Sequence, residues 1–237
     1  MKKRIIFIIL MIISLFVVTG CDNQNAIEFK KEYEDVNGKT LKDDIKYRSL
    51  EIDKDNPYVK VSIDDIATKL KNKETFYLYV GDSLCPWCRS GLEKMIEVAK
   101  KENIETIYYV DFWDDNHNEI LRDLYEIENE DEDGNVAFKK TKDATKGYDV
   151  LLESVSDYVQ DYTIMKDGKE YNVGVKRVYG GDHFYFENGK CQKYVSLRSD
   201  KLANANDELT KEVLKDQESK FTNFFTSKNV CTGNENC

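Results

Sequence analysis

The chain is 237 residues long, which is enough for one large domain or two small ones. Hydrophobic residues make up 41% of it and aromatic residues 12%, so a packed core is expected and a largely disordered chain is excluded. The formal net charge is -10 at pH 7. Because such a surface repels phosphate backbones, nucleic acid is not expected as a partner.

Residues 1–20 have the pattern of an export signal. Basic residues at positions 2–4 precede an apolar run over residues 5–18, which is shorter than the roughly 20 residues that a membrane-spanning helix needs. The sequence Val18-Thr19-Gly20-Cys21 then resembles a bacterial lipobox, where signal peptidase II cuts before a lipid-modified cysteine. We therefore expect lipidated Cys21 to hold the mature protein at the extracytoplasmic face of the cell membrane. An uncleaved anchor or an ordinary secretory signal is the alternative.

The next segment, residues 21–56, is polar and charged with few apolar residues, and this composition predicts a flexible tether. A folded domain is expected over residues 57–228, followed by a cysteine-containing tail over residues 229–237. Within the domain, the alternating sequence at 58–62 predicts a short strand. Ser62 and the acids after it are typical of the start of a helix.

An aromatic and β-branched run at 75–80 predicts a buried strand that leads directly into Cys85-Pro86-Trp87-Cys88. After this motif, four apolar residues recur at helical spacing: Leu92, Met95, Ile96 and Ala99. A further apolar strand is expected at 105–113. Strands that alternate with helices in this way indicate an α/β fold whose central sheet has parallel neighbours.

Beyond this strand, the pattern predicts an insertion of a helix and a hairpin at about residues 115–177. In chain order, the expected elements are a helix at 118–128, a helix at 146–159, a hairpin at 162–178 about Asp167-Gly168, a hairpin at 183–196 about Asn188-Gly189, and a final helix between Leu209 and Phe225.

The position of Cys85 and Cys88 favours redox chemistry. A strand that delivers Cys85 to the first turn of a helix places its sulfur near unpaired N–H groups and the positive end of the helix dipole, so its pKa is expected to fall. Pro86 suits the first helical position because its missing N–H would be unpaired there. Cys88, one turn on, is placed to attack a mixed disulfide at Cys85. We assign Cys85 as the nucleophile and Cys88 as the resolving cysteine.

A metal site, a structural disulfide and a hydrolase are the three alternatives for this pair. A zinc site would need a second pair of ligands, and neither His117 nor His183 lies in a ligand-like doublet, so no metal is expected. A purely structural disulfide would close a loop too short to be useful. A hydrolase that pairs Cys85 with His183 would leave Cys88 unexplained.

The expected export also bears on the remaining cysteines, because disulfides persist outside the cytoplasm. Cys231 and Cys237 could close a small structural disulfide in the tail, with a second redox pair as the alternative. Cys191 is expected to be a small buried hydrophobic residue rather than a reactive thiol.

The order of strand, C-x-x-C, helix, strand, insertion, hairpin around "FENGK" and final helix resembles the thioredoxin superfamily. "YVGDSLCPWCR" followed by "IYYVD" is similar to exported thioredoxin-like lipoproteins of Gram-positive bacteria, of the bacteriocin transport accessory type. This resemblance implies a thioredoxin-like fold in which helices flank a central mixed sheet. It also implies a redox-active disulfide and no cofactor.

Two positions depart from the thioredoxin pattern. The family has a cis-proline before the hairpin strand, and Gly181 is counted into that place here, so the loop of Gly180, Gly181 and Asp182 is expected beside Cys85 with trans peptides. The family's buried acid, six residues before the first cysteine, is replaced by Tyr79, so another group must handle protons.

Two side chains are expected next to the cysteines. Trp87, between them, would offer a flat apolar surface to an extended partner, or would simply be a half-covered surface aromatic. His183 either tunes Cys85 or begins a strand without such a role.

The function expected from these features is thiol–disulfide exchange with exported proteins, through a dithiol or disulfide of Cys85 and Cys88. The expected partners are exported protein or peptide thiols and disulfides, a membrane redox partner, and the membrane itself through the lipid. Whether electrons flow towards or away from substrates stays open. The alternative is a non-catalytic accessory lipoprotein that binds an exported peptide such as a bacteriocin.

Overall fold

The computed structural model describes residues 19–40, 46–114, 116, 118–130 and 135–227. These residues form a mixed α/β protein around a five-stranded sheet with the strand order β1-β3-β2-β8-β9. The strands that run parallel are β1 (Tyr58–Lys60), β3 (Ile107–Asp111) and β2 (Phe76–Gly81). The strands that complete the sheet in antiparallel pairing are β8 (Asp182–Glu187) and β9 (Lys190–Ser196).

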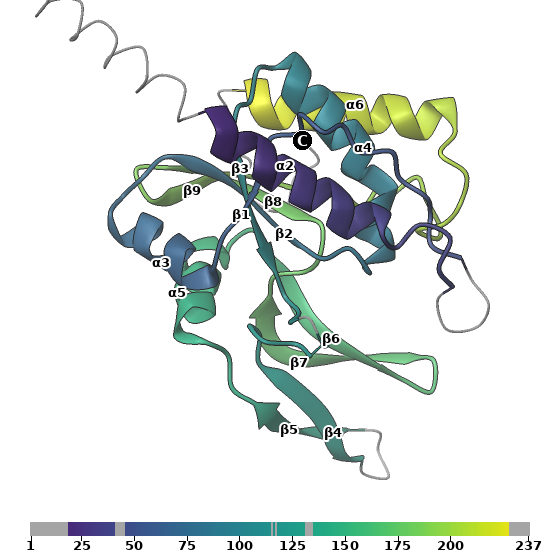
Figure 1. Ribbon diagram of the computed structural model, residues 1–237. Coiled ribbons are helices and arrows are strands. Elements are labelled where there is room, and N and C mark those ends of the chain that lie inside the picture. The colour runs from purple at the N-terminus through teal and green to yellow at the C-terminus, as the bar shows by residue number, and fades with distance from the viewer. Residues whose placement is uncertain (1–18, 41–45, 115, 117, 131–134, 228–237) are drawn as a thin grey trace, which may run out of the picture.

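Helices cover both faces of this sheet (Figure 1). One face carries α2 (Thr19–Glu34), α4 (Pro86–Lys101) and α6 (Lys211–Thr226). The other face carries α3 (Ile63–Lys71) and α5 (Lys146–Val155). Each face has its own hydrophobic cluster, because the strand residues point alternately to the two sides.

Most of the elements expected from the sequence are confirmed. Ser62 caps α3: its hydroxyl accepts a hydrogen bond from the Asp65 N–H, and the Asp65 carboxylate accepts one from the Ser62 N–H. The hairpin of β8 and β9 turns at Asn188, and both Asn188 and Gly189 have positive φ, as tight turns favour. The three parallel strands, α4, α5 and α6 also form close to the expected residues.

The expected helix at 118–128 is wrong. Residues Leu124–Glu130 form strand β4, which pairs in antiparallel register with β5 (Val136–Lys142). The apolar spacing fits a helix, but Tyr125 packs edge-on against Tyr162 of the neighbouring hairpin, with ring centroids 5.9 Å apart, and this tertiary contact favours the strand. The insertion therefore contains a helix and two hairpins.

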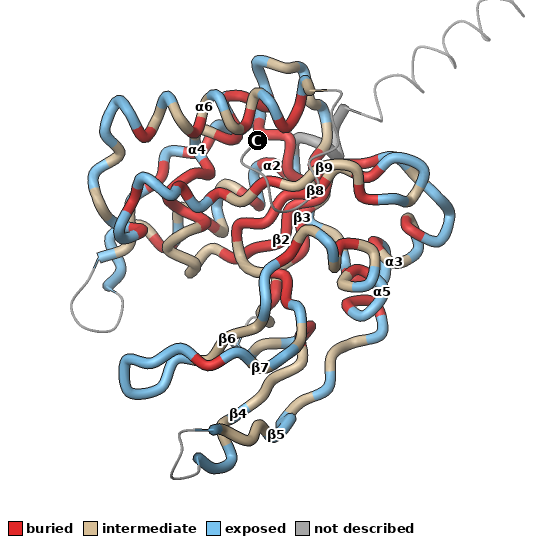
Figure 2. The backbone as a smooth tube through the Cα atoms, turned by 180° about the vertical axis from the view of Figure 1, so that it is seen from behind, coloured by how far each residue is buried: buried red, intermediate tan, exposed pale blue. Residues whose placement is uncertain are grey.

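The second of these hairpins consists of β6 (Gln160–Lys166) and β7 (Lys169–Arg177), as expected from Asp167-Gly168. Both hairpins project from the body of the molecule (Figure 1). Figure 2 shows buried residues concentrated in the central sheet and the helices around it, whereas the hairpins are mostly exposed or half-buried.

The expected flexible tether over residues 21–56 does not hold for most of that segment. Helix α2 packs on the sheet through Ala26, Phe29 and Tyr33, and Val36 in the turn that follows the helix is buried as well. Phe29 stacks on Tyr58 of β1 with ring centroids 4.3 Å apart. Leu50 and Ile52 are buried as well. Few apolar residues suffice here, because they recur three or four residues apart and so line one face of a helix.

Several expectations concern residues that lie outside the described part of the chain. These are the apolar part of the export signal, the tail with Cys231 and Cys237, and His117. Of Cys21, only the backbone within α2 is described. In the described ranges, no helix combines the length and the hydrophobicity that a membrane span requires.

Candidate functional site

Cys85 and Cys88 lie at the junction between β2 and α4. Cys85 is the N-cap of the helix, with extended backbone angles of φ -75° and ψ 112°. Its Sγ accepts a hydrogen bond from the backbone N–H of Cys88 at 3.1 Å. Pro86 occupies the first turn, as its missing N–H suggests. Cys85 is a free thiol and only half-buried at the start of the helix.

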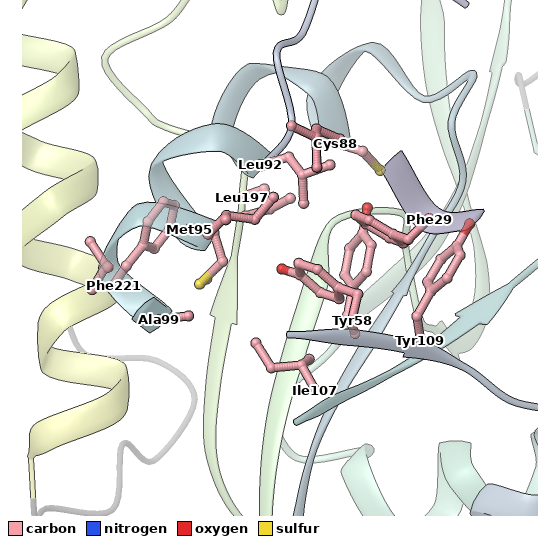
Figure 3. Close-up of a cluster of buried hydrophobic side chains, with 14 of the residues drawn as sticks. Phe29, Tyr58, Cys88, Leu92, Met95, Ala99, Ile107, Tyr109, Leu197 and Phe221 are labelled. Atoms are coloured by element: carbon pink, nitrogen blue, oxygen red, sulfur yellow. The ribbon is translucent and has the colours of Figure 1, made fainter. Parts of the chain in front are cut away.

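The second thiol, Cys88, is fully buried and also free. Its side chain points from α4 towards an aromatic cluster that includes Phe29, Tyr58 and Tyr109 (Figure 3). Burial raises the pKa of Cys88 well above its usual value, and the neighbouring Cys85 and Asp82 raise it further. The two cysteines thus differ: Cys85 is only half-buried, whereas Cys88 is fully buried and keeps its thiol proton.

Tyr79 of β2 supplies a polar contact to the buried sulfur. A hydrogen bond from the Tyr79 side chain to Cys88 opposes the rise in the pKa of that thiol. The Tyr79 hydroxyl also lies 2.7 Å from the hydroxyl of Tyr33 on α2. Gly81 is needed for this arrangement, since a Cβ there would collide with the Tyr79 hydroxyl. Burial raises the pKa of Tyr79 well above its usual value, so its hydroxyl stays protonated and can donate.

Asp82 is the residue of this site that the sequence analysis missed. It directly follows β2, three residues before Cys85, and only 8% of it is exposed. Its Oδ1 accepts a hydrogen bond from the Leu84 N–H at 2.8 Å, and the Trp113 side chain donates another. Burial raises its pKa to about 6, and the nearby Asp111 adds to this rise.

The carboxylate of Asp82 and the two sulfurs form one cluster. One oxygen of Asp82 and the Sγ atoms of Cys85 and Cys88 all lie within 4.8 Å of one another. An acid placed directly after a strand that leads into a C-x-x-C motif was the available signal. The thioredoxin pattern places its buried acid at the position of Tyr79 instead.

The loop of Gly180 and Gly181 faces the cysteines, as the sequence order predicts. A Cβ on Gly180 would lie 3.0 Å from the Cys85 Sγ and 3.1 Å from the Cys88 Sγ, so it is Gly180 that approaches the sulfurs. Gly181 has φ +103°, donates its N–H to the Val80 carbonyl at 3.0 Å and faces Leu197. In the described residues no peptide bond is cis.

Asp182 and His183 hold this loop from within the fold. The Asp182 carboxylate accepts hydrogen bonds from the Tyr179 N–H at 2.9 Å and from the Tyr194 hydroxyl at 3.0 Å. Burial raises the pKa of Asp182 to about 6. These contacts tie Asp182 to its own loop and to β9, so its role is to hold the loop in place.

His183 is neutral and has a defined tautomer. Burial lowers its pKa to about 3. Because a carbonyl can only accept, Nδ1 carries the proton and donates to the Gly181 carbonyl at 3.2 Å. Nε2 then accepts from the Tyr58 hydroxyl at 2.9 Å. His183 also stacks on Tyr79 with ring centroids 4.4 Å apart, so it supports the site from below.

Arg89 fastens α2 and the following segment to the site. Only 1% of it is exposed. Its guanidinium donates to the carbonyls of Tyr33, Arg48 and Ser83, and to the Asn37 side chain. These bonds satisfy a buried cation without a carboxylate partner among its hydrogen-bond acceptors. The segment expected to be a tether is therefore part of the wall behind the dithiol.

The other predicted side chains take separate places. Trp87 is half-buried, with the Arg198 guanidinium 4.7 Å above its ring, so its surface is partly covered. Cys191 is buried in the cluster on the opposite face of the sheet, where burial raises its pKa to about 12. Its behaviour is that of a small hydrophobic residue.

The chain was compared with protein-family models and with curated proteins. Neither comparison found a match. What the protein does is therefore inferred from the geometry of the dithiol and its surroundings.

Proposed function

We propose that the protein is a membrane-tethered thiol–disulfide oxidoreductase of thioredoxin-like fold, which acts on exported proteins through Cys85 and Cys88. The observation that carries the proposal is the pair of free sulfurs at the start of α4. Cys85 is half-buried, Cys88 is fully buried one turn on, and Gly180 brings the loop backbone close to both sulfurs without a side chain.

The topology supports the thioredoxin-like part of this proposal. Three parallel strands, an antiparallel hairpin and helices on both faces follow the order that the resemblance implies. The C-x-x-C motif sits at the junction of the central strand β2 and α4. The insertion lies between β3 and β8 in the amino-acid sequence. Its hairpins form separate two-stranded sheets, so they do not interrupt the strand order of the central sheet.

The chemistry follows from the positions of the two sulfurs. The Cys85 thiolate attacks one sulfur of a substrate disulfide, the substrate S–S bond breaks, and a mixed disulfide forms. Cys88 then gives up its proton and attacks the Cys85 sulfur, which releases the second substrate sulfur. Two electrons pass to the substrate and two protons follow them, while Cys85 and Cys88 become a disulfide. The reverse sequence oxidises a substrate dithiol.

Asp82 is the group that receives the proton from Cys88. With a pKa of about 6 it is ionised at neutral pH, and its oxygen is close enough to the buried sulfur to act directly or through one bridging water. Taking up the proton also removes the negative charge that opposes the Cys88 thiolate. The Asp82 carboxylate can therefore accept the Cys88 proton. Tyr79 cannot, because its hydroxyl is not ionised and can only donate a hydrogen bond to the sulfur.

The location belongs to the same proposal and rests on the sequence alone. Residues 1–20 would be removed as a lipoprotein signal, and a lipid on Cys21 would hold the domain at the extracytoplasmic face. A membrane redox partner would then set the direction of electron flow.

Insulin reduction with a defined thiol donor tests the activity. The full chain should accelerate the precipitation of insulin, and Cys85→Ser should abolish this acceleration. A wild-type chain with no more effect than the donor alone would refute the proposal and favour a non-catalytic accessory lipoprotein.

The order of attack has its own test on crude membranes. Cys88→Ser should accumulate mixed disulfides on a non-reducing gel, because nothing resolves them, whereas Cys85→Ser should accumulate none. Equal trapping by the two variants would contradict the assignment of Cys85 as the attacking sulfur.

A further inference from the structure

Asp82, Cys85 and Cys88 each offer a side-chain atom that could bind a metal ion. Their three candidate donor atoms all lie within 4.8 Å of one another. Donor atoms of a tetrahedral zinc site lie roughly 3.5 to 4 Å apart, given zinc–sulfur and zinc–oxygen bonds of about 2.3 and 2.1 Å. Shifts of about an ångström or less would therefore bring all three onto one ion.

The loop backbone at Gly180 lies directly beside the two sulfurs. A side chain at this position would place its Cβ 3.0 Å from one sulfur and 3.1 Å from the other. Glycine therefore lets the loop approach the sulfurs with no side chain between them. Since Cys85 is only half-buried, the fourth position of a tetrahedral ion is left to a ligand from outside the chain.

The donors are oriented by hydrogen bonds that would persist with a metal bound. The Leu84 N–H and the Trp113 side chain hold the Asp82 carboxylate, which can accept about four hydrogen bonds and so keeps capacity for an ion. The Cys88 N–H points at the Cys85 sulfur at 3.1 Å. Such outer contacts fix the ligands of metal sites in proteins.

We propose that Asp82 and the reduced pair Cys85 and Cys88 form a three-ligand site for a thiophilic divalent ion of the zinc class, with the fourth position left to an outside ligand. Two thiolates suit such an ion, and the carboxylate completes a donor set that zinc accepts. Binding changes no oxidation state: the two thiol protons leave to solvent, and two sulfur–metal bonds form. The negative surface of the chain favours the approach of a cation.

Metal binding and thiol exchange would then exclude each other. An ion on both sulfurs occupies the nucleophile and its resolving partner, and a disulfide between them removes two of the three ligands. The inference uses the residues of the proposed active site, but it requires only a reduced dithiol. It can therefore hold even where thiol exchange does not, and the reverse is equally true.

Cobalt titration of the purified full chain tests the site directly. Cys21, Cys231 and Cys237 are replaced by serine throughout, so that they cannot bind the probe, and the protein is reduced and kept free of oxygen. One Co²⁺ per chain should give thiolate-to-cobalt charge transfer in the near ultraviolet and the visible bands of a tetrahedral ion, and Zn²⁺ should displace it. The same protein oxidised to the Cys85–Cys88 disulfide should show none of these bands.

Variants identify the three ligands. Cys85→Ser, at a half-exposed position, should abolish the charge-transfer bands. Asp82→Asn should weaken cobalt binding by about tenfold or more, whereas Glu105→Gln, at an exposed position outside the cluster, should change it less than about threefold. Gly180→Ala should weaken binding as well, because its methyl group would press against both sulfurs.

Two results would overturn the inference. A reduced chain that gives no thiolate-to-cobalt bands has no such site, whatever its activity with insulin. An Asp82→Asn variant that binds cobalt as tightly as the parent chain would show that the carboxylate is not a ligand. Insulin reduction by metal-free protein remains the separate test of thiol exchange.

Discussion

Asp82→Asn should stabilise the reduced protein at neutral pH. The folded state raises the pKa of Asp82 from 3.8 to about 6, so the carboxylate prefers to hold a proton when the protein is folded. Its contribution to stability is thus complete below about pH 4 and is lost as the pH rises through about 6. A shift of roughly two units corresponds to about 3 kcal/mol of destabilisation at about pH 7.5, and asparagine carries no such cost.

The net gain should be smaller than this charge effect. Asparagine keeps an oxygen for the Leu84 N–H but has one acceptor fewer for the Trp113 side chain, and a lost hydrogen bond costs about 1 kcal/mol. We expect a gain of about 2 kcal/mol in the free energy of unfolding at about pH 7.5 and no gain at about pH 4. The stability gained by the substitution should therefore disappear as the pH falls from about 7.5 to about 4.

Urea denaturation followed by far-ultraviolet circular dichroism measures this gain at both pH values. Glu105→Gln, at an exposed position, removes one negative charge without touching the site and serves as the control. An Asp82→Asn variant that is less stable than the parent at about pH 7.5, or whose gain does not change with pH, would show that burial does not raise the pKa of this carboxyl.

Three further predictions concern the dithiol, the loop and the anchor. Tyr79→Phe removes the hydrogen bond to Cys88, so resolution of the mixed disulfide should slow by about tenfold in single-turnover kinetics while its formation is unchanged; equal slowing of both steps would contradict this role. Gly180→Ala should impair exchange with protein substrates more than with a small disulfide, because its methyl group crowds the docking space; equal losses in parallel rate assays would argue against it. Cys21→Ser should prevent both cleavage and recovery in the membrane fraction on blots, and a variant still cut after Gly20 would point to an ordinary secretory peptidase.

The sheet could be predicted from the sequence because its signals are local. Aromatic and β-branched runs mark β2 and β3, Ser62 caps α3, and Asn188-Gly189 requires a tight turn. The first hairpin of the insertion could not be predicted in the same way. Its residues fit a helical spacing, and the contact that favours the strand is made by Tyr162, a residue distant in the chain.

The site was predictable in outline only. The C-x-x-C motif located both sulfurs, and counting from the "NGK" turn located the loop to within one residue, since Gly180 rather than Gly181 faces them. The burial of Asp82 depends on the packing of Trp113 and Asp111 around it, which composition does not reveal. From sequence alone, a charged residue before a motif is expected to be solvent-exposed, and only the packed structure shows that Asp82 is buried.

The position of α2 changes what a lipid on Cys21 would do. A flexible tether over residues 21–56 would let the dithiol sample a wide volume above the membrane. Instead, Cys21 lies in the first turns of a helix that is buried against the sheet from Ala26 onward, and Tyr33 on the same helix contacts Tyr79 beside the dithiol. The 12 residues from Cys21 to Tyr33 span about 18 Å at 1.5 Å per residue. A lipid at Cys21 would thus hold the dithiol within a few nanometres of the membrane surface, which favours exported substrates that are still close to the site where they emerge.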